Sequence, residues 1–177
     1  MWTLCSLGSN LDPARNTASA LRALVKWFGP LEVSPLIETD AVNVTGGGTF
    51  LNGLVRFQTD CSDQELKRRL NALETALGRD RNHPKSKTRP RPIDIDILCR
   101  ADARDGLIAT ESTPYLDQML ASEADDSIGP RWKVKVDAAL LGEEAATIHF
   151  DHSTGQVRIA DQGPKGIQDG VQPAFAS

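Results

Sequence analysis

Two amphipathic segments, flanked by short apolar runs, constrain the fold of this 177-residue chain more than any other feature. Apolar residues recur every three or four positions over 13–28 and 63–77, which is the periodicity of a helix with one buried face. Runs of strand character surround these helices at 2–7, 31–37, 50–57 and 93–98. This order predicts an α+β fold, the ferredoxin-like βαββαβ sandwich, with both helices on one face of an antiparallel sheet.

The expected helix ends carry recognisable signals. Asp12 is in the N-cap position of the first helix, and Pro13 occupies its first turn. Ser62 and Glu65 form the pattern of a capping box at the start of the second helix, and Gly78 is expected to end it. The pattern of strands and helices therefore rests on local chemistry as well as on periodicity.

The sequence after residue 100 has weaker patterns. Strands are expected at 132–136, 147–150 and 156–159, the last two as a hairpin, so the fold gains a C-terminal β-rich segment. We expect residues 1–160 to form a single domain. Residues 161–177, rich in Gly, Gln and Pro, are expected to form a disordered tail.

The charge of the chain is unevenly distributed. The net charge is −4, yet residues 79–91 contain six basic residues and one acid, whereas residues 101–177 contain thirteen acids and six bases. One basic loop in an acidic chain favours a small anionic ligand over nucleic acid. No apolar run reaches the ~20 residues of a membrane span, the N-terminus lacks a signal-peptide pattern, and the three cysteines lack metal-ligand spacing. We expect a cytoplasmic monomer that binds neither nucleic acid nor membrane.

Asp94 and Asp96 are the central candidates for chemistry. They alternate with isoleucines over 93–98, so both carboxylates lie on one strand face, about 6–7 Å apart. Carboxylates at this spacing suit hard divalent cations, and the preceding basic loop suits phosphate oxygens. The combination is typical of phosphoryl transfer from a metal–nucleotide complex. An acidic strand face that is simply solvated is the alternative from spacing alone.

Phe50 and Asn52 are expected on the same sheet face as these aspartates, because the helices take the other face. An aromatic ring can stack on a planar heteroaromatic substrate, and a carboxamide can pair with its donor and acceptor edge. The two side chains therefore predict a site for a flat, polar ring.

Four ordered motifs carry a family resemblance: Leu7-Gly8-Ser9-Asn10, Phe50-Leu51-Asn52, Glu74 with Gly78-Arg79-Asp80-Arg81, and Arg89-Pro90-Arg91-Pro92-Ile93-Asp94-Ile95-Asp96-Ile97-Leu98. Together they resemble hydroxymethyl-dihydropterin pyrophosphokinase, a folate-pathway enzyme with a ferredoxin-like fold. The resemblance covers residues 1–100 as a core, and residues 101–160 diverge from it.

The resemblance implies transfer of pyrophosphate from ATP to the hydroxymethyl group of 6-hydroxymethyl-7,8-dihydropterin, with release of AMP. It implies two Mg²⁺ ions on Asp94 and Asp96, with ATP and the pterin as the partners. The implied catalytic residues are Arg79, Arg91, Asp94 and Asp96. The implied pterin-binding residues are Thr39, Val42, Phe50 and Asn52. The implied ATP-binding residues are Glu74, Arg79, Arg81, Arg91 and Tyr115.

Two departures from the family pattern leave alternatives open. The substrate loop reads Thr39-Asp40-Ala41-Val42 in place of a Pro-rich segment. Past the aspartates, the family's Pro-His pair reads Pro114-Tyr115 and its Arg-Phe pair is missing. Tyr115 or Trp132 is a candidate for the missing second stacking ring. A non-catalytic or altered-substrate pterin- or nucleotide-binding homologue is therefore the alternative function.

Overall fold

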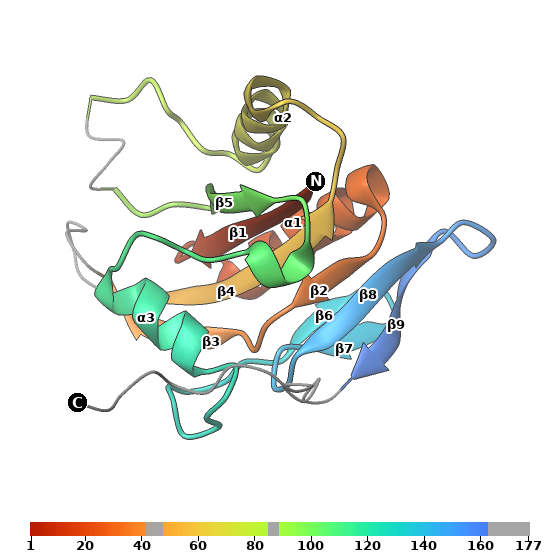
Figure 1. Cartoon of the computed structure of the whole chain (residues 1–177). Helices are drawn as coiled ribbons and strands as arrows, with labels where there is room; N and C mark the ends of the chain where they lie inside the picture. The colour runs from red at the N-terminus through yellow and green to blue at the C-terminus, as the bar shows by residue number, and fades with distance from the viewer. Residues whose placement is uncertain (42–47, 85–88, 163–177) are drawn as a thin grey trace, which may run out of the picture.

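The computed structural model describes residues 1–41, 48–84 and 89–162 of the chain (Figure 1). Val42, the glycines at 46 and 47, the lysines at 85 and 87, and residues 163–177 of the expected tail lie outside the described residues. The elements are β1 (Trp2–Ser9), α1 (Pro13–Phe28), β2 (Leu31–Val33), β3 (Ile37–Asp40), β4 (Thr49–Gln58), α2 (Asp63–Ala76), β5 (Asp94–Ala101), a 3₁₀ turn η1 (Arg104–Gly106), α3 (Pro114–Ala121), β6 (Val134–Val136), β7 (Ala139–Leu141), β8 (Ala146–Asp151) and β9 (Gln156–Gln162).

The chain has a mixed helix and strand architecture built on one antiparallel sheet. Its strands lie in the order β5-β1-β4-β2-β8-β9, with β3 also paired to β4. Helices α1 and α2 share one apolar core with Leu51, Val55 and Phe57 of β4, as the alternation predicted. Helix α3 packs on the opposite face, against Leu54 of the same strand (Figure 1). The sheet therefore has a face covered by two helices and a face that α3 covers in part.

The strand expected at 31–37 is divided, and this division affects the site. β2 ends at Val33, and β3 begins at Ile37 with its pairing to β4 shifted by one residue. Pro35 lacks an N–H and cannot continue the ladder. A one-residue shift turns the following side chains to the other face. As a result Thr39 pairs across from Phe50 and lies on the face of the sheet that α3 covers.

The two expected caps differ in outcome. The Ser62 hydroxyl accepts the Glu65 N–H at 3.3 Å, which confirms this half of the capping box. The Glu65 carboxylate accepts hydrogen bonds from Arg68 and Arg69. Asp12 occupies the N-cap position of α1 and Pro13 its first turn, as predicted. The Asp12 backbone is left-handed (φ 44°), however, and its carboxylate makes no cap hydrogen bond.

The C-terminal segment extends the sheet. Strands β8 and β9 pair as a hairpin beyond β2, and β6 and β7 form a separate two-stranded sheet beside α1. The strand expected at 132–136 is limited to Val134–Val136. β9 continues to Gln162, so residues 161 and 162, expected as part of the tail, are in a strand. Within the described part of the chain, no helix combines the length and apolar character needed to cross a membrane.

Candidate functional site

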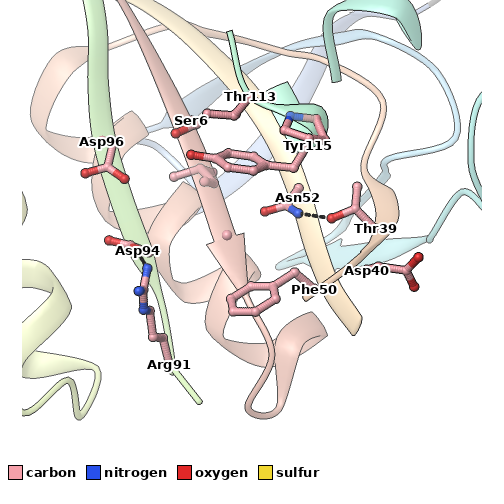
Figure 2. A pocket seen from close by; sticks show the side chains of 13 residues that line it. Ser6, Thr39, Asp40, Phe50, Asn52, Arg91, Asp94, Asp96, Thr113 and Tyr115 are labelled. Carbon is pink, nitrogen blue, oxygen red and sulfur yellow. Dashed lines mark hydrogen bonds and ion pairs between the residues drawn. The ribbon is translucent and has the colours of Figure 1, made fainter. Parts of the chain in front are cut away.

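A cavity of about 400 Å³ lies on the sheet face that α3 partly covers (Figure 2). Residues of β1, β3, β4, β5, the segment before β5 and the start of α3 contribute its walls. The lining consists of Ser6, Leu7, Gly8, Thr39, Asp40, Phe50, Asn52, Arg91, Asp94, Asp96, Thr113, Pro114 and Tyr115. Seven residues predicted from the sequence are thus brought together: Thr39, Phe50, Asn52, Arg91, Asp94, Asp96 and Tyr115.

Asp94 and Asp96 form the acidic wall of the cavity. They lie across from Gly8 and Ser6 of β1 and both face the cavity (Figure 2). Asp96 is exposed at the cavity wall, and partial desolvation and the neighbouring charge of Asp94 raise its pKa. A bound cation would offset the repulsion between the two carboxylates.

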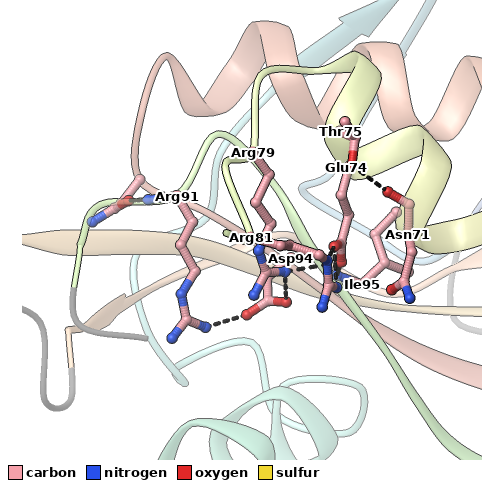
Figure 3. Close-up of polar contacts among 9 residues, drawn as sticks. Asn71, Glu74, Thr75, Arg79, Arg81, Arg91, Asp94 and Ile95 are labelled. Atoms are coloured by element: carbon pink, nitrogen blue, oxygen red, sulfur yellow. Dashed lines mark hydrogen bonds and ion pairs between the residues drawn. The ribbon is translucent and has the colours of Figure 1, made fainter. Parts of the chain in front are cut away.

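Arginines hold Asp94 on both sides. Its Oδ1 accepts a hydrogen bond from Arg79, and its Oδ2 accepts one from Arg91 (Figure 3). The Arg79 side chain is 13% exposed and that of Asp94 is 12% exposed, so this cluster is shielded from solvent. The positive charges that suit phosphate are consequently placed beside the proposed metal ligands.

Glu74 lies under this arginine cluster and is fully buried. Its Oε1 accepts the Ile95 N–H at 2.8 Å and lies 3.0 Å from Arg79 Nη1, while Oε2 accepts Arg81 Nε at 2.8 Å (Figure 3). Burial raises the pKa of Glu74, and these donors oppose that shift. Arg79, Arg81 and Glu74 lie beside the cavity rather than in its lining. The structure places Glu74 as a support for two arginines.

The oxygen ligands at the acidic wall suit Mg²⁺, and they do not form a site in which the protein alone fills every coordination position. Within residues 1–41, 48–84 and 89–162, no cluster of three or more His, Cys, Asp or Glu side chains could hold a metal ion. Mg²⁺ commonly binds through one or two carboxylates and completes its shell with water and substrate phosphates. Asp94 and Asp96 supply such an incomplete oxygen set at a cavity wall.

The other end of the cavity carries Phe50 and Asn52. The Asn52 amide donates to the Thr39 hydroxyl at 2.6 Å, and both residues are nearly buried, at 6% and 5% exposed. This bond fixes the carboxamide, whose Oδ1 faces Gly8. A half-buried ring next to a fixed carboxamide can bind a planar, hydrogen-bonding group.

Gly8 lets β1 pass close to Asn52, and replacing it with alanine should disturb the site. A Cβ at position 8 would lie 2.7 Å from Asn52 Oδ1. We expect Gly8→Ala to displace the carboxamide and to lower the free energy of unfolding, measured in urea, by about 1–3 kcal/mol. In an Asn52→Ala background the same change should cost much less. An equal cost in both backgrounds would show that the close approach is unimportant.

Helix α3 supplies one wall of the cavity, and this helix was not predicted from the sequence. The Thr113 hydroxyl accepts the Leu116 N–H, and Pro114 begins the helix. This Thr-Pro start is a recognised helix signal and could have revealed α3. Figure 2 shows the Tyr115 ring reaching across the cavity toward Ser6. Ser6, Leu7, Gly8, Asp40, Thr113 and Pro114 were not predicted as site residues.

Of the two candidate rings, only Tyr115 lines the cavity. Trp132 packs against the core on the α1 and α2 side, and its Nε1 donates to Glu38 at 3.0 Å. Trp132, the other candidate ring, therefore does not line this cavity.

Comparison with known proteins finds one matching family and several relatives. The family model described as 7,8-dihydro-6-hydroxymethylpterin-pyrophosphokinase matches residues 4–119. The 2-amino-4-hydroxy-6-hydroxymethyldihydropteridine pyrophosphokinase of Porphyromonas gingivalis is 35% identical over 95 residues, which are 52% of this chain and 65% of that protein. The protein of the same name from Aquifex aeolicus is 32% identical over 97 residues, 54% of this chain and 59% of that protein.

A folate synthesis bifunctional protein of Arabidopsis thaliana is 36% identical over 95 residues, 52% of this chain and 19% of that protein. The chain thus spans less than two thirds of the length of these relatives. The family match itself covers more than half of the chain and includes every element that lines the cavity, from β1 to the start of α3. On these grounds the chain belongs to the 7,8-dihydro-6-hydroxymethylpterin-pyrophosphokinase family.

Proposed function

We propose that the protein transfers pyrophosphate from Mg-ATP to the hydroxymethyl group of 6-hydroxymethyl-7,8-dihydropterin and releases AMP, a step of folate synthesis. The observation that carries this proposal is one cavity with Asp94, Asp96 and Arg91 at one end and Phe50 and Asn52 at the other. Two relatives carry the name of this pyrophosphokinase. The reactive oxygen of a pterin bound at the second end would face phosphates bound at the first.

The pterin end provides recognition. Phe50 would stack on the pterin ring, and Asn52 would pair with its edge through Oδ1. The bond from Asn52 to the Thr39 hydroxyl holds the carboxamide before the ligand arrives, which reduces the entropy lost on binding. Thr39 therefore acts through Asn52, and Val42 stays a prediction from the family resemblance.

The acidic end would hold the phosphates. Asp94 and Asp96 would bind two Mg²⁺ ions, which neutralise phosphate charge and orient the triphosphate. Arg79 and Arg91 would then exchange their hydrogen bonds with Asp94 for bonds to phosphate oxygens. Glu74 would keep Arg79 and Arg81 extended for this exchange, so its part in ATP binding is indirect.

The chemistry needs no covalent enzyme intermediate. The hydroxymethyl oxygen attacks the β-phosphorus and forms a new O–P bond, while its proton passes to solvent. The bond from that phosphorus to the α–β bridging oxygen breaks, and AMP leaves. The protein contributes position and charge neutralisation, which are the main sources of rate in phosphoryl transfer.

We also propose that the fold is ferredoxin-like and that residues 1–160 act as one domain. The order β5-β1-β4-β2 and the placement of α1 and α2 on one sheet face support the fold assignment. The hairpin β8–β9 continues the same sheet, which supports one domain over two.

AMP formation tests the proposed activity. With Mg-ATP and 6-hydroxymethyl-7,8-dihydropterin, chromatography should detect one AMP for each pterin diphosphate formed. EDTA in excess over Mg²⁺ should abolish both products. If no AMP forms while calorimetry still shows ATP binding, the protein is the non-catalytic or altered-substrate homologue and the pyrophosphokinase proposal is wrong.

A further inference from the structure

Helix α3 is attached to the sheet by an apolar cluster, by an ion pair just after the helix and by Arg131, whose Nη2 donates to the Ser122 carbonyl at 2.9 Å. The apolar cluster is the first of these contacts. Leu116 and Met119 of the helix pack against Leu4, Ile37 and Leu54, and all five side chains are at most 2% exposed. The cluster presses the middle of α3 onto β1, β3 and β4. These apolar contacts oppose separation of α3 from the sheet. Because they are not directional, they do not by themselves fix the angle at which α3 lies on the sheet.

The second attachment is a two-pronged ion pair just after the helix. Arg56 Nη1 and Nη2 donate to Glu123 Oε1 and Oε2 at 2.6 and 2.7 Å, and the side chains are 14% and 25% exposed. A planar guanidinium paired through two parallel bonds fixes orientation as well as distance. Partial burial reduces screening by solvent and salt.

The position of Arg56 connects this ion pair to the cavity. Arg56 lies on β4, on the same sheet face as Phe50 and Asn52, because side chains two, four and six residues apart share a face. At the other end of α3, Tyr115 reaches into the cavity (Figure 2). The ion pair therefore links β4, which carries Phe50 and Asn52, to the end of α3, which carries Tyr115.

We propose that Arg56 and Glu123 are positioning residues that set the orientation of α3 and thereby the place of Tyr115 in the cavity. The apolar cluster holds the helix down, and the ion pair selects one orientation of it. The kinetic consequence rests on the proposed pyrophosphokinase function, whereas the structural consequence can be tested without any activity.

Tyr115 is the single tyrosine of the chain, so it reports on α3 directly. Labelling with 3-fluorotyrosine gives one ¹⁹F resonance, which should shift or broaden in Glu123→Gln. The exchanged pair Arg56→Glu with Glu123→Arg should restore the wild-type line. Glu65→Gln, which removes ion pairs on α2 far in sequence from α3, is the matched control and should leave the line unchanged. An unaltered resonance in Glu123→Gln would overturn the proposal.

Kinetics separate positioning from general destabilisation. In Glu123→Gln we expect the KM for ATP to rise about tenfold while kcat stays within about twofold of wild type. This pattern is expected when a substitution weakens binding of the ground state and of the transition state equally. In a Tyr115→Ala background the same substitution should change KM less than twofold, because coupled residues are not additive. Equal effects in both backgrounds would show that Glu123 does not act through Tyr115. Absence of AMP in the wild type would refute the proposed function, and the ¹⁹F result would still decide the positioning role.

Discussion

Replacing Asp96 with asparagine is expected to lower kcat by about a thousandfold or more without loss of stability. A thousandfold change corresponds to about 4 kcal/mol of transition-state stabilisation, which is within what one metal-binding group supplies. Asp96 is exposed at the cavity wall, and partial desolvation and the charge of Asp94 raise its pKa in the folded protein, so the ionised carboxylate slightly weakens the fold as pH rises through this pKa. The neutral amide escapes that cost at pH 7.

Two comparisons sharpen this test. Asp102→Asn, at an exposed aspartate just beyond β5, should keep wild-type kcat. Asp94→Asn should also lose turnover, but it removes the charge and one of the two oxygens that accept hydrogen bonds from Arg79 and Arg91, so Asp96 is the cleaner position. Steady-state assays of AMP formation and urea denaturation measure the two quantities. Activity of Asp96→Asn within tenfold of wild type would contradict the metal assignment.

Replacing Glu74 with alanine should be the most damaging single change to stability among the site residues. Breaking a buried ion pair from one side commonly costs about 3–5 kcal/mol, because the partner charge stays buried without compensation. Glu74→Ala would remove the acceptor of Arg79, of Arg81 and of the Ile95 N–H. We expect a loss of about 3 kcal/mol, at the low end because Arg79 keeps its bond to Asp94.

The neighbouring residue provides the control for Glu74. Thr75 lies on the same turn of α2 but is exposed, and its hydroxyl donates to the Asn71 carbonyl in the same helix. Thr75→Ala should change the free energy of unfolding by less than about 0.5 kcal/mol. Urea denaturation of both variants decides the matter. A Glu74→Ala cost no larger than that of Thr75→Ala would mean that the carboxylate does not support the arginines.

Much of the site could be predicted because its signals are local. The alternation over 93–98 placed Asp94 and Asp96 on one face, and the structure has both in one cavity wall. The capping pattern placed the start of α2 at Ser62. Such features depend on residues within about four positions of one another, so hydrophobic periodicity and side-chain chemistry are sufficient to identify them.

The predictions that failed involve local as well as distant features. Pro35 is a local signal for the division of the strand at 31–37, whereas the bond from the Leu36 N–H to the Gly142 carbonyl joins segments far apart in the sequence. The change of register, which places Thr39 beside Asn52, could not be located from the sequence pattern. Asp12 occupies the N-cap position, but its own left-handed backbone accompanies a carboxylate that makes no cap bond.

The sequence by itself determines the order of the first strands and helices, the face shared by both aspartates and the chemistry of the cavity ends. The tertiary structure alone decides that Glu74 supports arginines, that Tyr115 rather than Trp132 lines the cavity, and that Arg56 and Glu123 join α3 to β4. The physical reason is distance along the chain. Periodicity and capping act between near neighbours, whereas burial, ion pairing and register depend on segments that only folding brings together.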